Sequence, residues 1–238
     1  MTIQPKTELK PIVILHGWGS SPERWKPIHK ALEAHTPFLP GFDEKNPLKR
    51  PFSVEDYALW LDMYLDSHNI KNPILVGHSN GGRIAIHYAA HYENISKLVL
   101  IASAGIPDPS KDFKKAVFKA LAKSGKKALK LVNNEKLAGF FQKILYKAAR
   151  ESDYVNAAPI MKKTMENILK YDAREDLGNI PVPALLIWGQ ADTATPVWMG
   201  HAMKKMIRTS QIKILPAKHN VHITHNKEVI QLINDFVS

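Results

Sequence analysis

The sequence predicts an α/β fold, in which helices cover both faces of a parallel sheet. Short apolar runs alternate with helical patterns along the chain, and these runs are continuously apolar, as expected for strands buried on both faces. With 238 residues, 45% of them hydrophobic and 23% charged, the chain can bury a large core. This composition excludes disordered and collagen-like proteins, and no apolar run reaches the roughly 18 residues of a membrane helix.

Six segments have the features of buried strands, because each is short, apolar and bounded by glycine, proline or polar residues. They are Pro11–Leu15, Thr36–Leu39, Pro73–Val76, Leu98–Ala102, Ala184–Trp188 and Gln211–Leu215.

Helices are predicted between these strands from their start signals. Ser21 and Thr195 each stand before a proline, a pattern typical of an N-cap followed by the first helical residue. Ser53 precedes Asp56 at the spacing of a capping box. A last amphipathic helix is expected over about residues 227–237.

The alternation stops over residues 105–178, where only helical patterns appear. We therefore expect a core made of residues 1–104 and 179–238, with a helical insertion over residues 105–178 between the fourth and fifth strands. The charge is concentrated in this insertion. Residues 105–150 carry twelve basic and three acidic side chains, a net charge of +9 out of +11 for the whole chain.

The segment Gly77-His78-Ser79-Asn80-Gly81 is the first that carries chemistry. It is a G-x-S-x-G motif, and it lies between a predicted strand and a helical pattern. This is the context of a nucleophile elbow, a sharp turn that exposes a reactive serine. The alternative is a chance match in a glycine- and serine-rich loop, but the flanking elements favour Ser79 as a nucleophile.

The segment His16-Gly17-Trp18-Gly19 directly follows the first predicted strand. Acyl transfer needs two backbone N–H groups that bind the developing oxyanion. Asn80, which follows the serine, is expected to supply one, and Trp18 the other. The alternative is a glycine-rich turn in which Trp18 packs into the core, and both can hold because the donor is a backbone group.

Asp192 and His219 follow the last two predicted strands, and functional groups gather at such strand ends in open parallel sheets. The order Ser79, Asp192, His219 is that of a serine–acid–histidine triad. Asp192 can instead be a turn residue bonded to its own loop. Among eleven histidines His222 is the main competitor of His219, whereas His16, His78, His87 and His91 are expected to be structural or solvated. No metal-ligand spacing competes with this interpretation, so neither a metal nor a cofactor is expected.

In these motifs the sequence resembles the α/β-hydrolase family. The resemblance rests on His16–Gly19, Gly77–Gly82, Trp188–Pro196 and His219, with Leu39–Phe42 similar to the family's proline–glycine loop. It covers nearly the whole chain, the insertion only loosely. It implies six parallel strands in the order 2-1-3-4-5-6, and a serine hydrolase that cleaves carboxylic esters of small to medium acyl groups through an acyl-enzyme.

The resemblance further implies that the insertion is a lid over Ser79. Five aromatic residues are candidates to line the pocket, although each can equally pack the lid onto the core: Phe113, Phe118, Phe140, Phe141 and Tyr146. The family's pimeloyl-carrier-protein methyl ester esterases are similar in the HGWG-type loop and in having basic lid residues. The lid charge therefore suggests an anionic carrier, an anionic membrane surface, or only a solvated helix face. No motif indicates nucleic acid.

Other functions fit the same motifs. A carbon–carbon bond hydrolase, a thioesterase, a lactonase or a perhydrolase would use the same triad, and a small-molecule receptor would show slow or no turnover. No secretion signal is recognised at the N-terminus, so the cytoplasm is the expected location.

Overall fold

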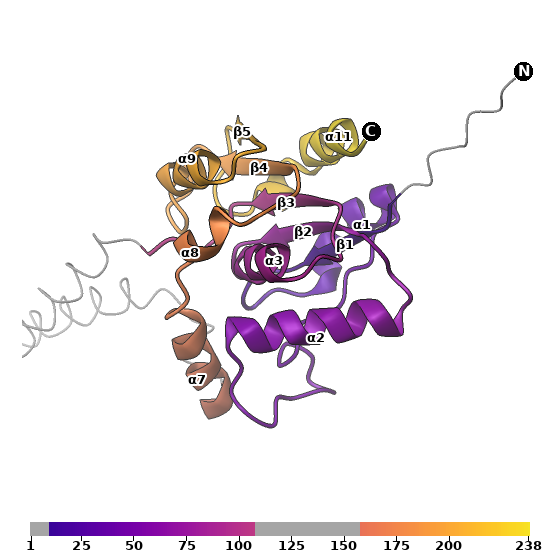
Figure 1. Ribbon diagram of the computed structural model, residues 1–238, viewed down its shortest axis with the longest axis vertical. Helices are drawn as coiled ribbons and strands as arrows, with labels where there is room; N and C mark the ends of the chain where they lie inside the picture. Colours follow the sequence, from indigo (N-terminus) through magenta and orange to yellow (C-terminus); the bar gives the residue numbers. More distant parts are fainter. Residues whose placement is uncertain (1–9, 108–157) are drawn as a thin grey trace, which may run out of the picture. The chain divides into compact units, whose positions relative to one another are not determined.

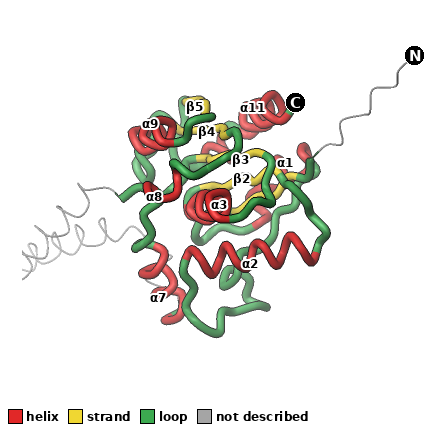
Figure 2. Tube along the Cα trace, viewed as in Figure 1, coloured by secondary structure: helices red, strands yellow, loops and turns green. Residues whose placement is uncertain are grey.

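The computed structural model describes residues 10–107 and 158–238, in which strands and helices alternate (Figure 1, Figure 2). Five parallel strands form one sheet in the order β1-β2-β3-β4-β5. They are β1 (Ile12–Leu15), β2 (Ile74–His78), β3 (Lys97–Ile101), β4 (Ala184–Gly189) and β5 (Ser210–Leu215). Five of the six predicted strands are thus confirmed to within two residues at each end.

Helices follow the strands as the α/β prediction requires. The first half of the chain contains the 3-10 helix η1 (Pro22–Trp25), α1 (Lys26–Leu32), α2 (Val54–Ser67) and α3 (Asn80–His91). The second half contains α7 (Pro159–Ile168), α8 (Arg174–Leu177), α9 (Val197–Met206), α10 (Val221–Thr224) and α11 (Asn226–Val237). None of the described helices is long and apolar enough to cross a membrane.

The sheet has a separate hydrophobic core on each face. Neighbouring strand residues point to opposite faces, so Leu75 and Leu100 join the core formed with α2, α3, α8 and α9, whereas Val76 and Val99 join the core formed with α1, α10 and α11. Every residue of β1, β2 and β4 is buried. Burial on both faces explains why these strands are continuously apolar in the sequence.

The sixth predicted strand, Thr36–Leu39, is wrong. Only His35 pairs with β1, as an isolated parallel bridge to Val13, with His35 N–H donating to the Ile12 carbonyl and Ile14 N–H donating to that of His35. The next position that would donate to β1 is Pro37, which has no N–H. The chain therefore leaves the sheet edge after one pair, although it lies on the predicted side of β1.

The predicted helix starts have two outcomes. Ser53 and Asp56 form the expected capping box at α2, with each side chain accepting from the other's backbone N–H. At α9 the prediction is off by one residue, since Pro196 is the N-cap and no side chain caps the helix. The hydroxyl of Thr195 is used elsewhere, in the site described below.

The predicted insertion over residues 105–178 lies partly outside the described residues. The described residues up to and including Ile106, and those from Lys163 onward, belong to one compact unit that contains the sheet. A second unit spans Pro107–Lys162. Within the first unit the N–H of Ala173 donates to the carbonyl of Gly105 at 3.0 Å. Gly105 has a φ of 142°, and a Cβ there would lie 2.8 Å from that of Ala173.

Candidate active site

Ser79 stands at the sharp turn between β2 and α3 that the G-x-S-x-G motif predicts. Its backbone has φ 52° and ψ −113°, a strained conformation for a residue with a side chain. The turn is held by hydrogen bonds from Ser79 N–H to Ile101 and from the Ala104 N–H to the Ser79 carbonyl. A Cβ on Gly81 would lie 2.2 Å from the Leu15 carbonyl oxygen, so the elbow fits against β1 only without a side chain there.

His219, in the loop between β5 and α10, is bonded to both other members of the predicted triad. Its Nε2 lies 3.0 Å from the Ser79 Oγ, and its Nδ1 lies 2.9 Å from Oδ2 of Asp192. A neutral imidazole that donates from Nδ1 to the carboxylate leaves the Nε2 lone pair free to accept the serine proton. The arrangement is therefore that of a nucleophile, a base and an acid in series.

Asp192 is the buried end of this series, because its side chain has no exposed surface. Burial by itself raises the pKa of a carboxyl. Hydrogen bonding and charge from His219, together with hydrogen bonds from Thr195, outweigh this effect and hold the pKa of Asp192 below its usual range. The backbone N–H groups of Ala194 and Thr195 both donate to Oδ1. Asp192 is therefore an ionised, fixed partner for His219.

Thr195, which the sequence predicts only as a helix cap, lies beside Asp192 and His219. Its hydroxyl lies 2.8 Å from Oδ2 of Asp192, 3.0 Å from the Ala102 carbonyl and 3.2 Å from Nδ1 of His219. Its single proton can be donated to either oxygen, which ties the acid's loop to the end of β3. A hydroxyl three residues after the acid is the only sequence signal for this role.

The loop after β1 lies directly against the elbow, as the oxyanion prediction requires. A Cβ on Gly17 would lie 3.3 Å from the Ser79 Cβ. Within the described residues, neither the Trp18 N–H nor the Asn80 N–H donates a backbone hydrogen bond. The indole of Trp18 packs edge-on against Phe42 at 4.9 Å, so its side chain is engaged while its N–H is available.

His16 fixes the position of that loop, which is the structural role expected for it. Its ring is fully buried, with Nδ1–H donating to the Gly17 carbonyl and Nε2 accepting the N–H of Leu39. Burial lowers the pKa of His16, which keeps this ring neutral. One imidazole therefore joins the loop after β1 to the loop that begins at Leu39.

His78 and His222 are buried beside the triad without joining it. His78 Nε2 donates to the His219 carbonyl at 3.3 Å. His222, the competitor of His219, stacks on Trp25 with ring centroids 4.1 Å apart, and neither of its nitrogens has a partner among the described residues. Burial is the main cause that lowers the pKa of His78 and brings that of His222 to about 3. The structure thus brings His219, and not His222, to Ser79.

The predicted pocket residues Phe113, Phe118, Phe140, Phe141 and Tyr146 lie outside the described residues. An open cavity of about 600 Å³ lies on the loop before α2, and its lining includes none of the triad residues. Its lining residues are Pro40, Asn46, Pro47, Leu48, Lys49, Arg50 and Phe52.

Comparisons with known proteins identify the family of the chain. The model of the "Alpha/beta hydrolase family" matches residues 12–232. A pimeloyl-[acyl-carrier protein] methyl ester esterase of Pseudoalteromonas atlantica is 26% identical, covering 92% of this chain and 90% of that protein.

Solved structures show the same fold at lower identity. An esterase from Exiguobacterium antarcticum has a TM-score of 0.70 at 19% identity, covering 96% of this chain and 91% of that one. The enol-lactonase from Burkholderia xenovorans has a TM-score of 0.72 at 20% identity, covering 98% and 93%. The chain therefore belongs to the alpha/beta hydrolase family and is a hydrolase with esterase-like homologues.

Proposed function

We propose that the chain hydrolyses carboxylic esters of small to medium acyl groups through a Ser79–His219–Asp192 triad and an acyl-enzyme. The observation that carries this proposal is the position of His219, within hydrogen-bond distance of both the Ser79 hydroxyl and the Asp192 carboxylate. The strained backbone of Ser79 supports it, since such strain occurs at functional sites. The similar protein named as a methyl ester esterase also supports a carboxylic ester as substrate.

Each group has one role in the proposed reaction. Ser79 Oγ attacks the ester carbonyl carbon while His219 Nε2 takes its proton, and the protonated imidazole then gives that proton to the leaving alcohol. Asp192 holds the imidazole in the Nδ1–H tautomer and stabilises its positive charge. The N–H groups of Trp18 and Asn80 bind the oxyanion. Water then attacks the acyl carbon while His219 Nε2 takes its proton, and the imidazolium returns that proton to Ser79 Oγ as the acid leaves.

Steady-state hydrolysis of p-nitrophenyl esters, from acetate to decanoate, tests this proposal. Wild type should turn over many times, and Ser79→Ala should lower kcat by about 10⁴-fold or more, because triad residues act as a unit. Asp192→Asn should lower kcat by roughly 10³–10⁴-fold without unfolding the protein, because it disturbs the His219 tautomer. A wild type with one turnover or none would contradict the proposal and favour a receptor.

We further propose that the insertion over residues 105–178 acts as a lid and that the substrate is an ester borne by an acyl carrier. It rests on the net charge of +9 in residues 105–150 and on the similar protein that is named as acting on an acyl-carrier-protein ester. An acidic carrier would be attracted to a segment with this positive charge. A free small ester would gain nothing from it.

Charge reversal separates these substrates. One variant changes the lysines Lys114, Lys115, Lys126 and Lys127 to Glu. A matched control reverses four exposed lysines outside the insertion: Lys204, Lys205, Lys213 and Lys227. The first variant should lower kcat/KM for an acyl-carrier-protein ester by roughly 10-fold or more and leave p-nitrophenyl butyrate hydrolysis unchanged. Equal losses on both substrates, or equal effects of the control, would contradict the carrier.

A further inference from the structure

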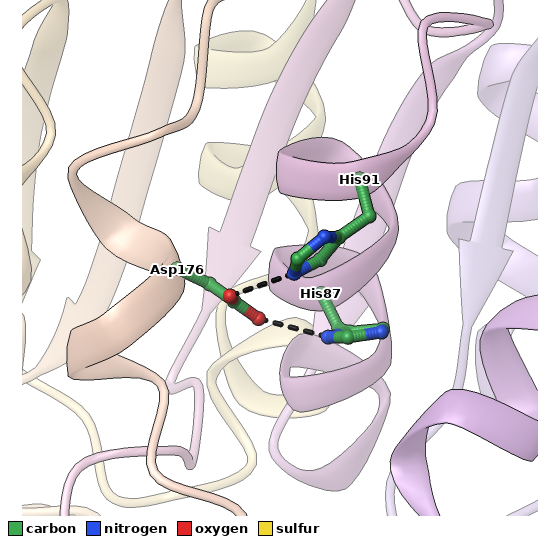
Figure 3. A group of neighbouring side chains, drawn as sticks. All are labelled: His87, His91 and Asp176. Carbon is green, nitrogen blue, oxygen red and sulfur yellow. Dashed lines mark hydrogen bonds and ion pairs between the residues drawn. The ribbon is translucent and has the colours of Figure 1, made fainter.

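Three side chains that could ligate a metal meet at the far end of the helix that begins at the elbow (Figure 3). His87 and His91 stand one turn apart on α3, and Asp176 faces both of them from α8. His87 Nδ1 lies 2.8 Å from Oδ2 of Asp176, and His91 Nε2 lies 2.8 Å from Oδ1. The candidate ligand atoms all lie within 4.8 Å of one another.

The donor set matches a borderline divalent cation. Two imidazoles at positions i and i+4 of a helix form a recurring zinc-binding pair, and a carboxylate is a common third ligand. With metal–ligand bonds of about 2.0 Å, tetrahedral ligands lie roughly 3.3 Å apart. The 2.8 Å nitrogen–oxygen contacts would therefore open slightly, and the wider separations, which reach at most 4.8 Å, would close. The nitrogens that now donate to the carboxylate would coordinate the ion through their lone pairs once each neutral ring carries its proton on the other nitrogen.

The surroundings of the cluster resemble those of a built site. Asp176 is buried, and the Tyr171 hydroxyl donates to its Oδ2 at 2.7 Å, which fixes the carboxylate as outer partners fix metal ligands. The side chain of His91 is 48% exposed, whereas that of His87 is 14% exposed. An ion would therefore have access from the His91 side, and water could complete its coordination there.

We propose that His87, His91 and Asp176 bind one divalent transition-metal ion, with zinc the best match, which cross-links α3 to α8. The ion would not take part in the hydrolysis, because His87 lies eight positions after Ser79, about 12 Å along the helix axis. Its effect is structural. It joins the helix that carries the elbow to the segment that follows Ala173, where the chain is bonded back to Gly105.

Cobalt and zinc titrations of tag-free, chelator-treated protein test the site directly. Wild type should bind one Co²⁺ with visible absorption of a nitrogen- and oxygen-ligated ion, and Zn²⁺ should displace it. His91→Ala should weaken binding by more than about 100-fold, since loss of an outer partner alone costs 10- to 100-fold. The control His201→Ala, an exposed histidine on α9, should bind as wild type does. Equal binding by His91→Ala, or no binding by wild type, would overturn the proposal.

Melting temperatures distinguish a metal site from a metal-free hydrogen-bonded clamp. At 100 times its dissociation constant, zinc should raise the Tm of wild type by roughly 5 °C and leave that of His91→Ala unchanged. If the cluster were only a hydrogen-bonded clamp, the Tm of His91→Ala would lie below that of wild type by the same amount with zinc as without it. That result would overturn the proposal.

Anomalous scattering provides a test that needs no variant. Wild-type crystals grown with zinc, measured above and below the zinc edge, should show one peak between His87, His91 and Asp176. No peak there, or a peak only at the other histidines, would overturn the proposal.

Discussion

The imidazole of His78 donates a hydrogen bond to the backbone carbonyl of His219, 3.3 Å away and 141 positions later in the sequence. The residue before the nucleophile thus holds the loop that carries the proposed base. His78 has no exposed path to a substrate, since it is buried, so its effect on catalysis would act through the position of His219.

Substitution of His78 should therefore lower kcat more than it raises KM. We expect His78→Leu to lower kcat by about 10- to 100-fold, as a displacement of about 1 Å does, with KM changed less than threefold. His78→Gln, which offers an N–H near the Nε2 position, should recover most of the loss. Kinetics with p-nitrophenyl butyrate measure both, and an equal loss in the two variants would show that the hydrogen bond is unimportant.

Thr195 offers a second test, because its hydroxyl bonds to the buried Asp192. Thr195→Val keeps the shape and removes the hydroxyl, so the free energy of unfolding should fall by about 1–3 kcal/mol. The pKa of Asp192 should rise towards its unfolded value, so the variant should lose less further stability than wild type when the pH falls below about 4. Thr195→Ser should behave as wild type in urea unfolding at pH 4 to 8, and a destabilised Thr195→Ser would argue for packing of the methyl group instead.

The glycines around the elbow should separate activity from stability. Gly81→Ala would force a Cβ to 2.2 Å from the Leu15 carbonyl oxygen, a backbone atom, and should cost about 3 kcal/mol. Gly17→Ala meets His78 Nδ1 at 2.9 Å and the Ser79 Cβ at 3.3 Å, so we expect about 1 kcal/mol and at least a 10-fold loss of kcat/KM.

Gly178→Ala is the control for both variants. Nothing lies within 4 Å of its added Cβ, and its φ is −72°. It should keep full activity and gain about 0.4–1 kcal/mol, because alanine restricts the unfolded chain. Urea unfolding and ester hydrolysis, measured on the same samples, give both quantities. Full activity of Gly17→Ala would contradict the close fit of the loop to the elbow.

His222 should make the protein sensitive to mild acid. Its pKa is about 3 in the folded protein, mainly because it is buried, and about 6.5 when unfolded. Between these values the unfolded chain binds one proton more than the folded chain. The free energy of unfolding therefore begins to decrease as the pH falls through about 6.5. Between about pH 5.5 and the folded pKa of about 3, it decreases by roughly 1.4 kcal/mol per pH unit.

His222→Phe should reduce that slope. The phenyl ring can keep the stack on Trp25, and it removes two buried nitrogens that have no partner among the described residues. We expect stability at pH 7.5 to be equal or higher than in wild type, and a flatter stability curve from pH 6.5 to 4.5. Urea unfolding over this range measures it, and parallel curves for the two proteins would contradict the burial argument.

The core motifs could be predicted from sequence because each is local. Apolar strands, the G-x-S-x-G turn and the capping box at Ser53 depend on residues within a few positions of one another, and the structure has the turn, the capping box and five of the six strands where expected. The sheet edge could not be predicted in the same way. Thr36–Leu39 has the apolar character of a strand, but the N–H missing at Pro37 matters only once β1 lies beside it.

The roles of several polar residues also needed the fold. Thr195 has the sequence features of a helix cap, yet its hydroxyl hydrogen-bonds to the carbonyl of Ala102, just after the neighbouring strand β3. His87 and His91 were expected to be structural or solvated, and their i, i+4 spacing acquires meaning only through Asp176, 85 positions beyond His91. Pairings at such separation leave no local pattern in one sequence.

The hydrogen bond between Ala173 and Gly105 brings both ends of a long intervening stretch together, just beyond the end of β3. Closing a longer loop at a fixed point costs little, about 0.6 kcal/mol for each doubling of its length. Residues 158–172 pack on the core through the buried Ile168, so a chimera that keeps them and replaces only the stretch before them should leave the strands and the elbow in place. Such a junction would allow the length of this stretch to change while the residues of the elbow keep their positions.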